Sequence, residues 1–358
     1  MPNDNDDQKV ISNLYHHHLD SLKPESKRLY LTWKDRFINH LHQEFTKILR
    51  NSSSSSSTIN EDTVINQFKA LQQSNPNTLM QIISSFFINH HNSEQNKFKS
   101  STLWNGYAAI GCYLRLVVKY ELKSEAPSIE KLLKNYQKQE ETKTSSSFSN
   151  DQINNYLQQA PNDMNHLIKK VYVILGTYGL LRIGETAYLQ FEDIEYDEQR
   201  NIINVALHRE KQSGPKALSN YIITNNDHVN IISQYIKKFS KDQRKGRFFR
   251  YFNDKDEPTN KQIGKNTIAS YPQEIASFLN LNNPSSYTGH SLRKTGATLL
   301  ADSGVDVINI QRAGGWSSPN IASKYVQQSS SIKNTISSAI SQQIQSTTTS
   351  SSSTTFCK

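Results

Sequence analysis

The chain of 358 residues exceeds the size of one ordinary hydrophobic core, so its length predicts about two domains. Its composition combines 35% apolar residues with a formal net charge of +9, which favours a polyanionic partner such as nucleic acid. Two cysteines, Cys112 and Cys357, are too few for a disulfide framework or a cysteine-based zinc site. The sequence shows no signal peptide and no apolar run of membrane-spanning length, and we therefore expect an intracellular protein.

Helical periodicity predicts that the first third of the chain is a bundle of four or five helices. In "KPESKRLYLTWKDRFINHL", Ser26 could cap a helix whose large apolar residues recur every four positions, namely Leu29, Trp33, Phe37 and Leu41. The segment "STLWNGYAAIGCYLRLVVKY" carries a second apolar stripe, and weaker helical signals lie at 63–72 and 79–90.

The second part of the chain has a mixed pattern. "HLIKKVYVILGTYGLLRIGETAYL" has apolar residues at helical spacing, after which the period changes. Three short β-prone runs, "FEDIEYDE", "NIINVALHRE" and "ALSNYIIT", predict a three-stranded antiparallel sheet. Helical patterns resume at 229–239 and continue past Gly289. We therefore expect a mainly α fold with a small antiparallel β-sheet, in the α+β class.

Polar segments separate these parts. Between Glu121 and Asn150, "KLLKNYQKQEETKTSSSFSN" loses its apolar period, as a linker would. Serine-rich runs cannot bury enough apolar surface to fold. We expect a flexible N-terminus at 1–20, a helical domain at 21–138 with a serine-rich loop at 51–58, a linker at 139–150, a second domain at 151–330, a C-terminal helix at 331–345 and a disordered tail at 346–358.

Several cations lie where a folded chain would need an anion. Arg182 follows a strongly apolar helix in "GLLRIGE", where an unpaired guanidinium would be costly to bury, and Glu185 could pair with it. His290, Arg293 and Lys294 fall in the first turn of a predicted helix, where positive charge opposes the helix dipole. A bound phosphate would reverse that effect, because free backbone N–H groups at a helix start also attract anions.

These residues, taken in order, resemble the tyrosine recombinase, or lambda-integrase-like, family. The resemblance consists of "GLLRIGE", a lysine in the hairpin turn "KQSGPK", "HSLRKTGAT", "GGW" and a tyrosine nine residues after that tryptophan. It is strong over about residues 150–330. It implies a catalytic domain there, preceded by a helical core-binding (SAM-like) domain, with the two domains forming a C-shaped clamp on double-stranded DNA.

The resemblance also implies a role for each matched residue. Its catalytic set is Arg182 and Arg293 as the phosphate clamp, Tyr325 as nucleophile, His290 as proton acceptor, Trp316 as a packing N–H donor and Lys211 as the acid that protonates the leaving 5' oxygen. Lys216 is a rival to Lys211, and Glu185 fits the acidic residue that steadies the first arginine. Lys216, Lys294 and Lys324 are expected to contact DNA, and Lys294 could instead face a neighbouring carboxylate.

The function that follows is site-specific DNA recombination through a 3'-phosphotyrosyl intermediate, without metal, ATP or other cofactor. The family implies a homotetramer on two DNA sites, with no membrane and no small-molecule substrate. Serine- and asparagine-rich tracts suggest a eukaryotic mobile element of the DIRS or Crypton type, hence a nuclear protein, or a cytoplasmic one in a prokaryotic or viral context. The alternatives are a type IB topoisomerase-like enzyme and a domesticated, non-catalytic DNA-binding regulator.

Two further patterns are less specific. Ile332, Ile336, Ile340 and Ile344 recur every four residues near the C-terminus. By resemblance to the family's last helix this stripe is expected to dock onto a neighbouring subunit; the alternative is packing on its own catalytic domain. The charged run "KKFSKDQRKGRFFR" could be a nuclear localisation signal or a phosphate-contacting strip, although such runs are usually solvated faces.

Overall fold

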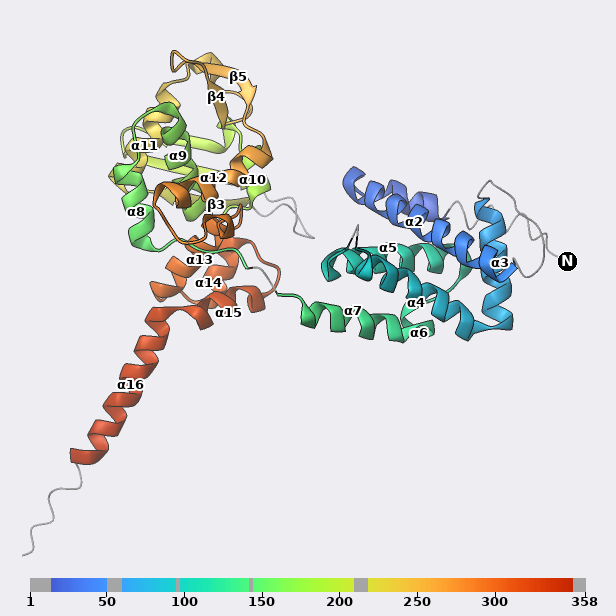
Figure 1. Ribbon diagram of the computed structural model, residues 1–358. Helices are drawn as coiled ribbons and strands as arrows, with labels where there is room; N and C mark the ends of the chain where they lie inside the picture. The colour runs from blue at the N-terminus through green and yellow to red at the C-terminus, as the bar shows by residue number, and fades with distance from the viewer. Residues whose placement is uncertain (1–13, 50–59, 95–96, 142–143, 209–217, 350–358) are drawn as a thin grey trace, which may run out of the picture. The chain divides into compact units, whose positions relative to one another are not determined.

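The computed structural model describes residues 14–49, 60–94, 97–141, 144–208 and 218–349 (Figure 1). The chain divides into two compact units, Met1–Thr142 and Lys143–Lys358. Among the described residues, no helix is both long and apolar enough to cross a membrane. The expected serine-rich loop at 51–58 and most of the expected disordered tail lie outside the described residues.

The first unit is helical, as its periodicity predicts. After a helical segment at 14–20, its helices are α2 (Pro24–Leu49), α3 (Glu61–Ser74), α4 (Pro76–Asn92), α5 (Ser100–Val118), α6 (Leu122–Glu125) and α7 (Pro127–Gln139). Trp33 and Phe37 are fully buried and meet Phe86 edge to face, with ring centroids 6.1 and 5.4 Å away. Leu29, in contrast, is 38% exposed. Ser26 does not cap α2, because the helix already begins at Pro24.

Two segments of this unit differ from the sequence prediction. Residues 14–20, expected to be flexible, are helical, and Tyr15 and Leu19 are buried. The segment after Glu121 contains α6 and α7, where a loss of apolar period suggested a linker. Helix α7 buries Ile129 and Leu133, which lie four residues apart. Together with Leu132 and Tyr136, which pack against the same core, they lie at helical spacing, so the apolar period continues through α7.

The second unit combines helices with two small sheets. Its helices are α8 (Asn150–Gln159), α9 (Met164–Tyr178), α10 (Ile183–Tyr188), α11 (Asn226–Lys237), α12 (Lys265–Phe278), α13 (Ser291–Asp302), α14 (Val307–Gly314), α15 (Pro319–Gln328) and α16 (Ser330–Thr349). The strands β1 (Ile194–Asp197), β2 (Ile202–His208) and β3 (Leu218–Ile223) form the expected antiparallel sheet in the order β1-β2-β3. Val205 lies opposite both Ile194 and Tyr221. The expected fold class is confirmed.

A second antiparallel sheet escaped the sequence prediction. Strands β4 (Arg250–Phe252) and β5 (Pro258–Gln262) pair across an irregular register. The charged run before β4 is therefore not one solvated face: Phe248 and Phe249 are buried, and the guanidinium of Arg250 lies 5.3 Å from the ring centroid of Phe191. A three-residue strand is too short to show alternation, which explains why the sheet was missed.

Helices α13, α14 and α15 pack around a small apolar cluster apart from the main core of the unit. Its buried members are Leu180, Ala297, Ala301, Ile310, Trp316 and Ala322. Alanine allows close helix approach here, and Gly296 allows the backbone of α9 to come near α13: a Cβ at Gly296 would lie 2.3 Å from the carbonyl oxygen of Thr177. This packing brings the end of α9 against the segment that carries the predicted site.

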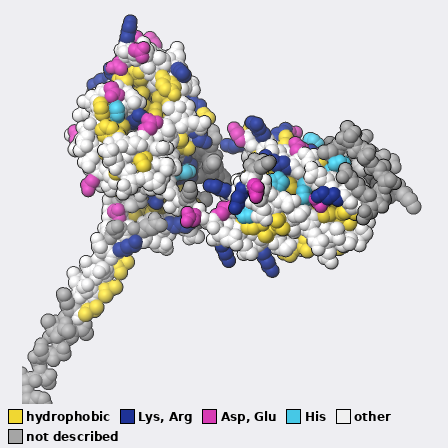
Figure 2. Space-filling model, in the orientation of Figure 1, with side chains coloured by type: hydrophobic (Ala, Val, Ile, Leu, Met, Phe, Trp, Pro, Cys, Tyr) yellow, Lys and Arg dark blue, Asp and Glu magenta, His cyan; other side chains and the backbone are white. Residues whose placement is uncertain are grey.

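Helix α16 leaves this cluster and shows an apolar row on its surface (Figure 2). Ile332 is partly buried, whereas Ile336, Ile340 and Ile344 are 55%, 55% and 64% exposed. Within the described part of one chain, the stripe therefore packs only at its beginning. The helix runs to Thr349, four residues beyond its expected end.

Candidate active site

Arg182 lies at the N-cap of α10, directly after the chain leaves α9. Its guanidinium Nη1 donates to Glu185 Oε1 at 2.6 Å, and its backbone N–H donates to Glu185 Oε2 at 2.7 Å. The ion pair expected from the sequence is therefore present, with 26% and 14% of the two side chains exposed. The other terminal nitrogen, Nη2, donates to the carbonyl oxygen of Gly315 at 3.1 Å. The carboxylate thus orients a guanidinium that also reaches the end of α14.

Arg293 lies in the first turn of α13 and is buried. Its guanidinium donates to two carbonyl oxygens, that of Leu180 through Nη1 and that of Gly314 through Nη2 at 2.6 Å. The guanidinium carbon lies 4.5 Å from the ring centroid of Trp316, a cation–π contact. Carbonyl oxygens and an aromatic face stabilise a guanidinium without neutralising it, so these contacts keep positive charge in the site.

The two arginines meet at one backbone turn, which we call the Gly314–Gly315 turn. Gly314 ends α14, and Gly315 has the left-handed φ of +58°. A Cβ at Gly314 would lie 2.3 Å from the Trp316 ring. Consecutive carbonyl oxygens of this turn accept hydrogen bonds from Arg293 and Arg182, respectively. The "GGW" motif therefore has a local role that the sequence did not reveal, because backbone acceptors leave no pattern of side chains.

Trp316 and Tyr325 are stacked beside this turn. Their ring centroids are 5.4 Å apart with an interplanar angle of 24°. Tyr325 lies on α15, which begins at Pro319 after Ser318 caps it. Burial raises the pKa of the half-buried Tyr325 phenol, and the positive charge of Arg293 acts in the opposite direction. Arg293, Trp316 and Tyr325 thus form one continuous contact.

The start of α13 is tied to the first residues of the second unit. His290 is the N-cap residue and its side chain is exposed. Lys294 is half-buried and donates to the carbonyl oxygen of Ser145 at 3.1 Å, whereas the sequence suggested a DNA phosphate or a carboxylate. The Ser145 hydroxyl also lies 2.8 Å from the Ser291 hydroxyl. A contact between residues this far apart in the sequence could not be read from local spacing.

The remaining predicted residues are placed as follows. Lys211 and Lys216 lie outside the described residues. Lys324 is exposed on α15, next to Tyr325. Within the described ranges, no three histidine, cysteine, aspartate or glutamate side chains gather as metal ligands would.

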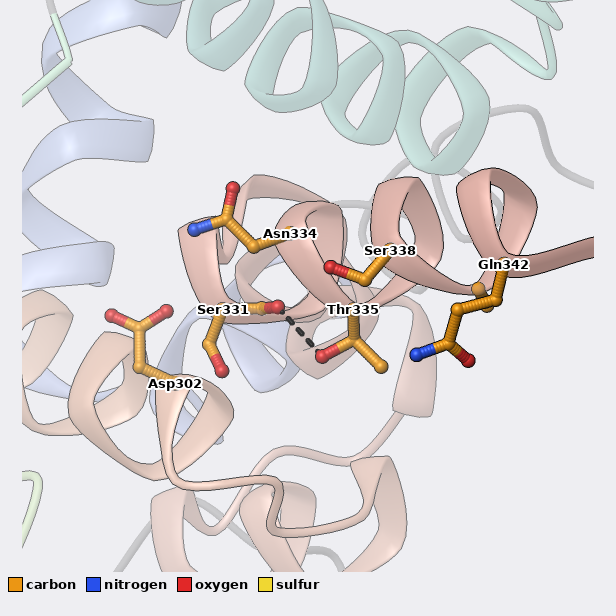
Figure 3. Close-up of a pocket in the computed structure, with 7 residues that line it drawn as sticks. Asp302, Ser331, Asn334, Thr335, Ser338 and Gln342 are labelled. Atoms are coloured by element: carbon orange, nitrogen blue, oxygen red, sulfur yellow. Dashed lines mark hydrogen bonds between the residues drawn. The ribbon is translucent and has the colours of Figure 1, made fainter. Parts of the chain in front are cut away.

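A cavity of about 700 Å³ lies elsewhere in the unit, beside the N-terminal half of α16 (Figure 3). One face of α16 and the end of α13 line it, through Asp302, Ser331, Asn334, Thr335, Ser338, Ala339 and Gln342. Thr335 Oγ1 donates to the carbonyl oxygen of Ser331 at 2.9 Å, as the dashed line shows. None of the residues predicted to act on DNA lines this cavity. We therefore place the candidate active site at the two arginines and not at this hollow.

Two guanidinium groups and a phenol gathered at one turn suit attack on a phosphodiester, which is the chemistry of tyrosine recombinases. The model of the phage integrase family matches residues 146–331, just over half of the chain. The chain belongs to the phage integrase family, and it is accordingly a site-specific tyrosine recombinase.

Solved structures show the same fold. The XerH site-specific recombinase, bound to a palindromic difH substrate in a post-cleavage complex, is 13% identical with a TM-score of 0.52, and the match covers 89% of this chain and 98% of that one. The Tn1549 transposon integrase, in complex with circular intermediate DNA, is 14% identical with a TM-score of 0.51, covering 80% and 94% respectively. No curated protein matches the chain.

Proposed function

We propose that the chain cleaves and rejoins double-stranded DNA through a covalent bond between Tyr325 and a 3' phosphate. The observation that carries this proposal is the meeting of Arg182, Arg293, Trp316 and Tyr325 at the Gly314–Gly315 turn. These side chains come from α13, α15 and the segments before α10 and α15. No simple packing requirement brings two guanidiniums to adjacent carbonyl oxygens beside a stacked tyrosine.

The arginines would stabilise the transition state. Attack on a phosphodiester concentrates negative charge on its non-bridging oxygens. A guanidinium stabilises that charge through planar N–H donors and stays protonated at any working pH. The Arg182 guanidinium has five N–H donors, of which one bonds Glu185 and one bonds the carbonyl oxygen of Gly315. If each arginine resembles an oxyanion-hole donor, its loss would raise the barrier by about 3–4 kcal/mol.

The Tyr325 phenol requires help to attack. Since burial raises its pKa, the phenol stays protonated at neutral pH, and its proton must leave as the O–P bond forms. His290 is the acceptor we propose, because a neutral imidazole nitrogen can accept a proton and the side chain is exposed at the start of α13. The leaving 5' oxygen takes a proton from Lys211, with Lys216 as the rival donor.

Strand cleavage by Tyr325 exchanges one phosphate ester bond for another and so needs no cofactor. The O–P bond to Tyr325 replaces the O–P bond to the 5' oxygen, so the energy of the phosphodiester is kept in the phosphotyrosyl bond. Attack by the 5' hydroxyl of another strand reverses the step and frees the phenol. The reaction we propose thus requires neither metal nor ATP.

Recombination requires several copies of the enzyme, and α16 is the segment we propose to link them. Its exposed residues Ile336, Ile340 and Ile344 would be covered by a neighbouring subunit in a tetramer on two DNA sites. The same exposed stripe favours recombination over relaxation by a type IB topoisomerase, which needs no such link. Every residue of the catalytic set that the resemblance implies is present in the sequence, which favours an enzyme over a domesticated regulator.

The biological setting we propose is a mobile element. The resemblance to integrases and the polar low-complexity tracts suggest integration or excision of a DIRS- or Crypton-type element in a eukaryotic nucleus. In a prokaryotic or viral context the same enzyme would act in the cytoplasm.

A pool of nicked duplexes with randomised sequence around the nick tests the proposed chemistry without knowledge of the target. After cleavage the short strand between the cut and the nick dissociates, so its 5' hydroxyl is no longer there to reverse the reaction. A covalent protein–DNA adduct therefore accumulates, and its DNA can be sequenced. We expect an adduct that resists denaturation, is lost in Tyr325→Phe and carries one preferred sequence. No adduct from the unmodified protein, or an equal amount from Tyr325→Phe, would contradict the proposal.

A further inference from the structure

Gln311, in the last full turn of α14, holds both backbone groups of Trp316. Its side-chain Nε2 donates to the Trp316 carbonyl oxygen at 3.0 Å. Its own carbonyl oxygen accepts from the Trp316 backbone N–H at 3.1 Å. One residue, which the sequence did not single out, therefore holds the residue that directly follows the Gly314–Gly315 turn. The side chain is half-buried and is not among the predicted catalytic residues.

The turn depends on such hydrogen bonds because its own residues supply little stiffness. Glycine has the widest backbone freedom of all residues, and two of them follow each other here. Gly315 uses this freedom at φ +58°, and a side chain at Gly314 would collide with Trp316. Glycine cannot be replaced by a stiffer residue without strain, so hydrogen bonds from outside the turn must fix its direction.

The direction of this turn decides where both arginines lie. Gly314 accepts from Arg293 Nη2 at 2.6 Å, and Gly315 accepts from Arg182 Nη2 at 3.1 Å. A rotation of either peptide plane would remove one of these acceptors. The guanidinium concerned would then turn away from the position that it now takes, while Tyr325 would keep its place in α15.

We propose that Gln311 is a positioning residue for the phosphate clamp: its side-chain amide fixes the Gly314–Gly315 turn, which in turn orients Arg182 and Arg293. The inference rests on the proposed function, since it assumes that the arginines meet the scissile phosphate. Gln311 itself touches no reacting atom. Loss of the Gln311 amide should therefore reduce how strongly the rate of adduct formation depends on the phosphate charge, and should leave the attacking phenol in place.

The test uses the duplex recovered from the adduct pool, made with either an ordinary phosphodiester or an uncharged methylphosphonate at the scissile position. Two variants of the full chain remove the donor: Gln311→Met, which is apolar, and Gln311→Glu, which keeps the shape of the amide. Gln327→Met, at an exposed position of α15, is the matched control. Thermal unfolding shows whether each variant folds, and Gln311→Glu carries the test if Gln311→Met does not.

We expect the Gln311 variants to form adduct about ten- to a hundredfold more slowly on the phosphodiester, a part of the loss of a full oxyanion donor. On the methylphosphonate the loss should be much smaller, because a neutral centre needs less positive charge. Equal losses on both substrates would overturn the inference, as would full activity of folded variants. If the unmodified protein formed no adduct at all, the proposed function itself would fall, and this distinguishes the two failures.

Discussion

Side chains serve opposite purposes around the Gly314–Gly315 turn and on helix α16. In the first, every charged or aromatic group of the proposed clamp that the structure describes, apart from His290, has a partner in the same chain: Arg182 with Glu185, Arg293 with two carbonyl oxygens, Trp316 with Tyr325. In α16, three isoleucines project from the surface with 55% or more exposure. The proposed chemistry is thus built within one chain, whereas the proposed assembly requires a second.

Disturbing the two arginines should have the largest effect. Arg293→Lys should slow adduct formation by about a hundredfold, because an ammonium cannot reproduce the planar contacts to Leu180, Gly314 and the Trp316 ring. Arg312→Lys, at an exposed position of α14, is the control and should be silent. Adduct rates on the duplex recovered from the pool measure both. A wild-type rate in Arg293→Lys would mean that the guanidinium geometry is irrelevant.

Changes in α16 should have the reverse effect, sparing chemistry and removing assembly. Ile336→Asp combined with Ile340→Asp places two charges on the exposed row and should lower the yield of paired-site product by at least about tenfold, since burying a charge is costly. Adduct formation on single nicked duplexes should be unchanged. Light scattering of the DNA complex reports assembly directly. Retained assembly in the double variant would show that α16 is not the link.

A milder change in the clamp sharpens the role of its carboxylate. Glu185→Gln keeps the shape but removes the charge that orients Arg182, and we expect adduct formation to fall about tenfold. Glu198→Gln, exposed in the β1–β2 turn, serves as the control. Rates of adduct formation by these two variants on the recovered duplex measure the effect. A loss as large as that of Arg293→Lys would assign Glu185 a direct part in the reaction.

The smallest effect is expected where the two regions join. Ser329 is fully buried; its hydroxyl donates to Asp302 Oδ1 at 2.6 Å and accepts from the Ile332 backbone N–H at 3.2 Å. Ser329→Ala removes this cap and should cost about 1–2 kcal/mol of the free energy of unfolding. Ser338→Ala, exposed on α16, should cost much less. Chemical denaturation measures both, and equal values would show that the cap contributes nothing.

The sequence predicted side-chain chemistry better than backbone partners. The Arg182–Glu185 pair and the three-stranded sheet both follow from local spacing. The carbonyl acceptors of Arg293, the contact of Lys294 with Ser145 and the contact of Gln311 with Trp316 do not. Every residue carries the same backbone acceptor, so only the folded path of the chain shows which of them meets a cation.

Short and polar elements escaped prediction for a related reason. The β4–β5 pair is too short to show a period. Helix α7 does carry apolar residues at helical spacing, Ile129, Leu132, Leu133 and Tyr136, but its many charged and polar residues favoured a linker. Both lie in segments whose charge suggested solvent. Burial of Phe248 and Phe249 beside Arg250 shows that a charged run can still pack its aromatic members.

The residue to which the DNA becomes attached decides whether Tyr325 is the nucleophile. The adduct from the randomised pool, digested with protease and nuclease, should yield one nucleotide-bearing peptide, from α15, with the phosphate on Tyr325. Attachment at any other residue would contradict the proposal that the turn, the arginines and the stacked tyrosine form the active site.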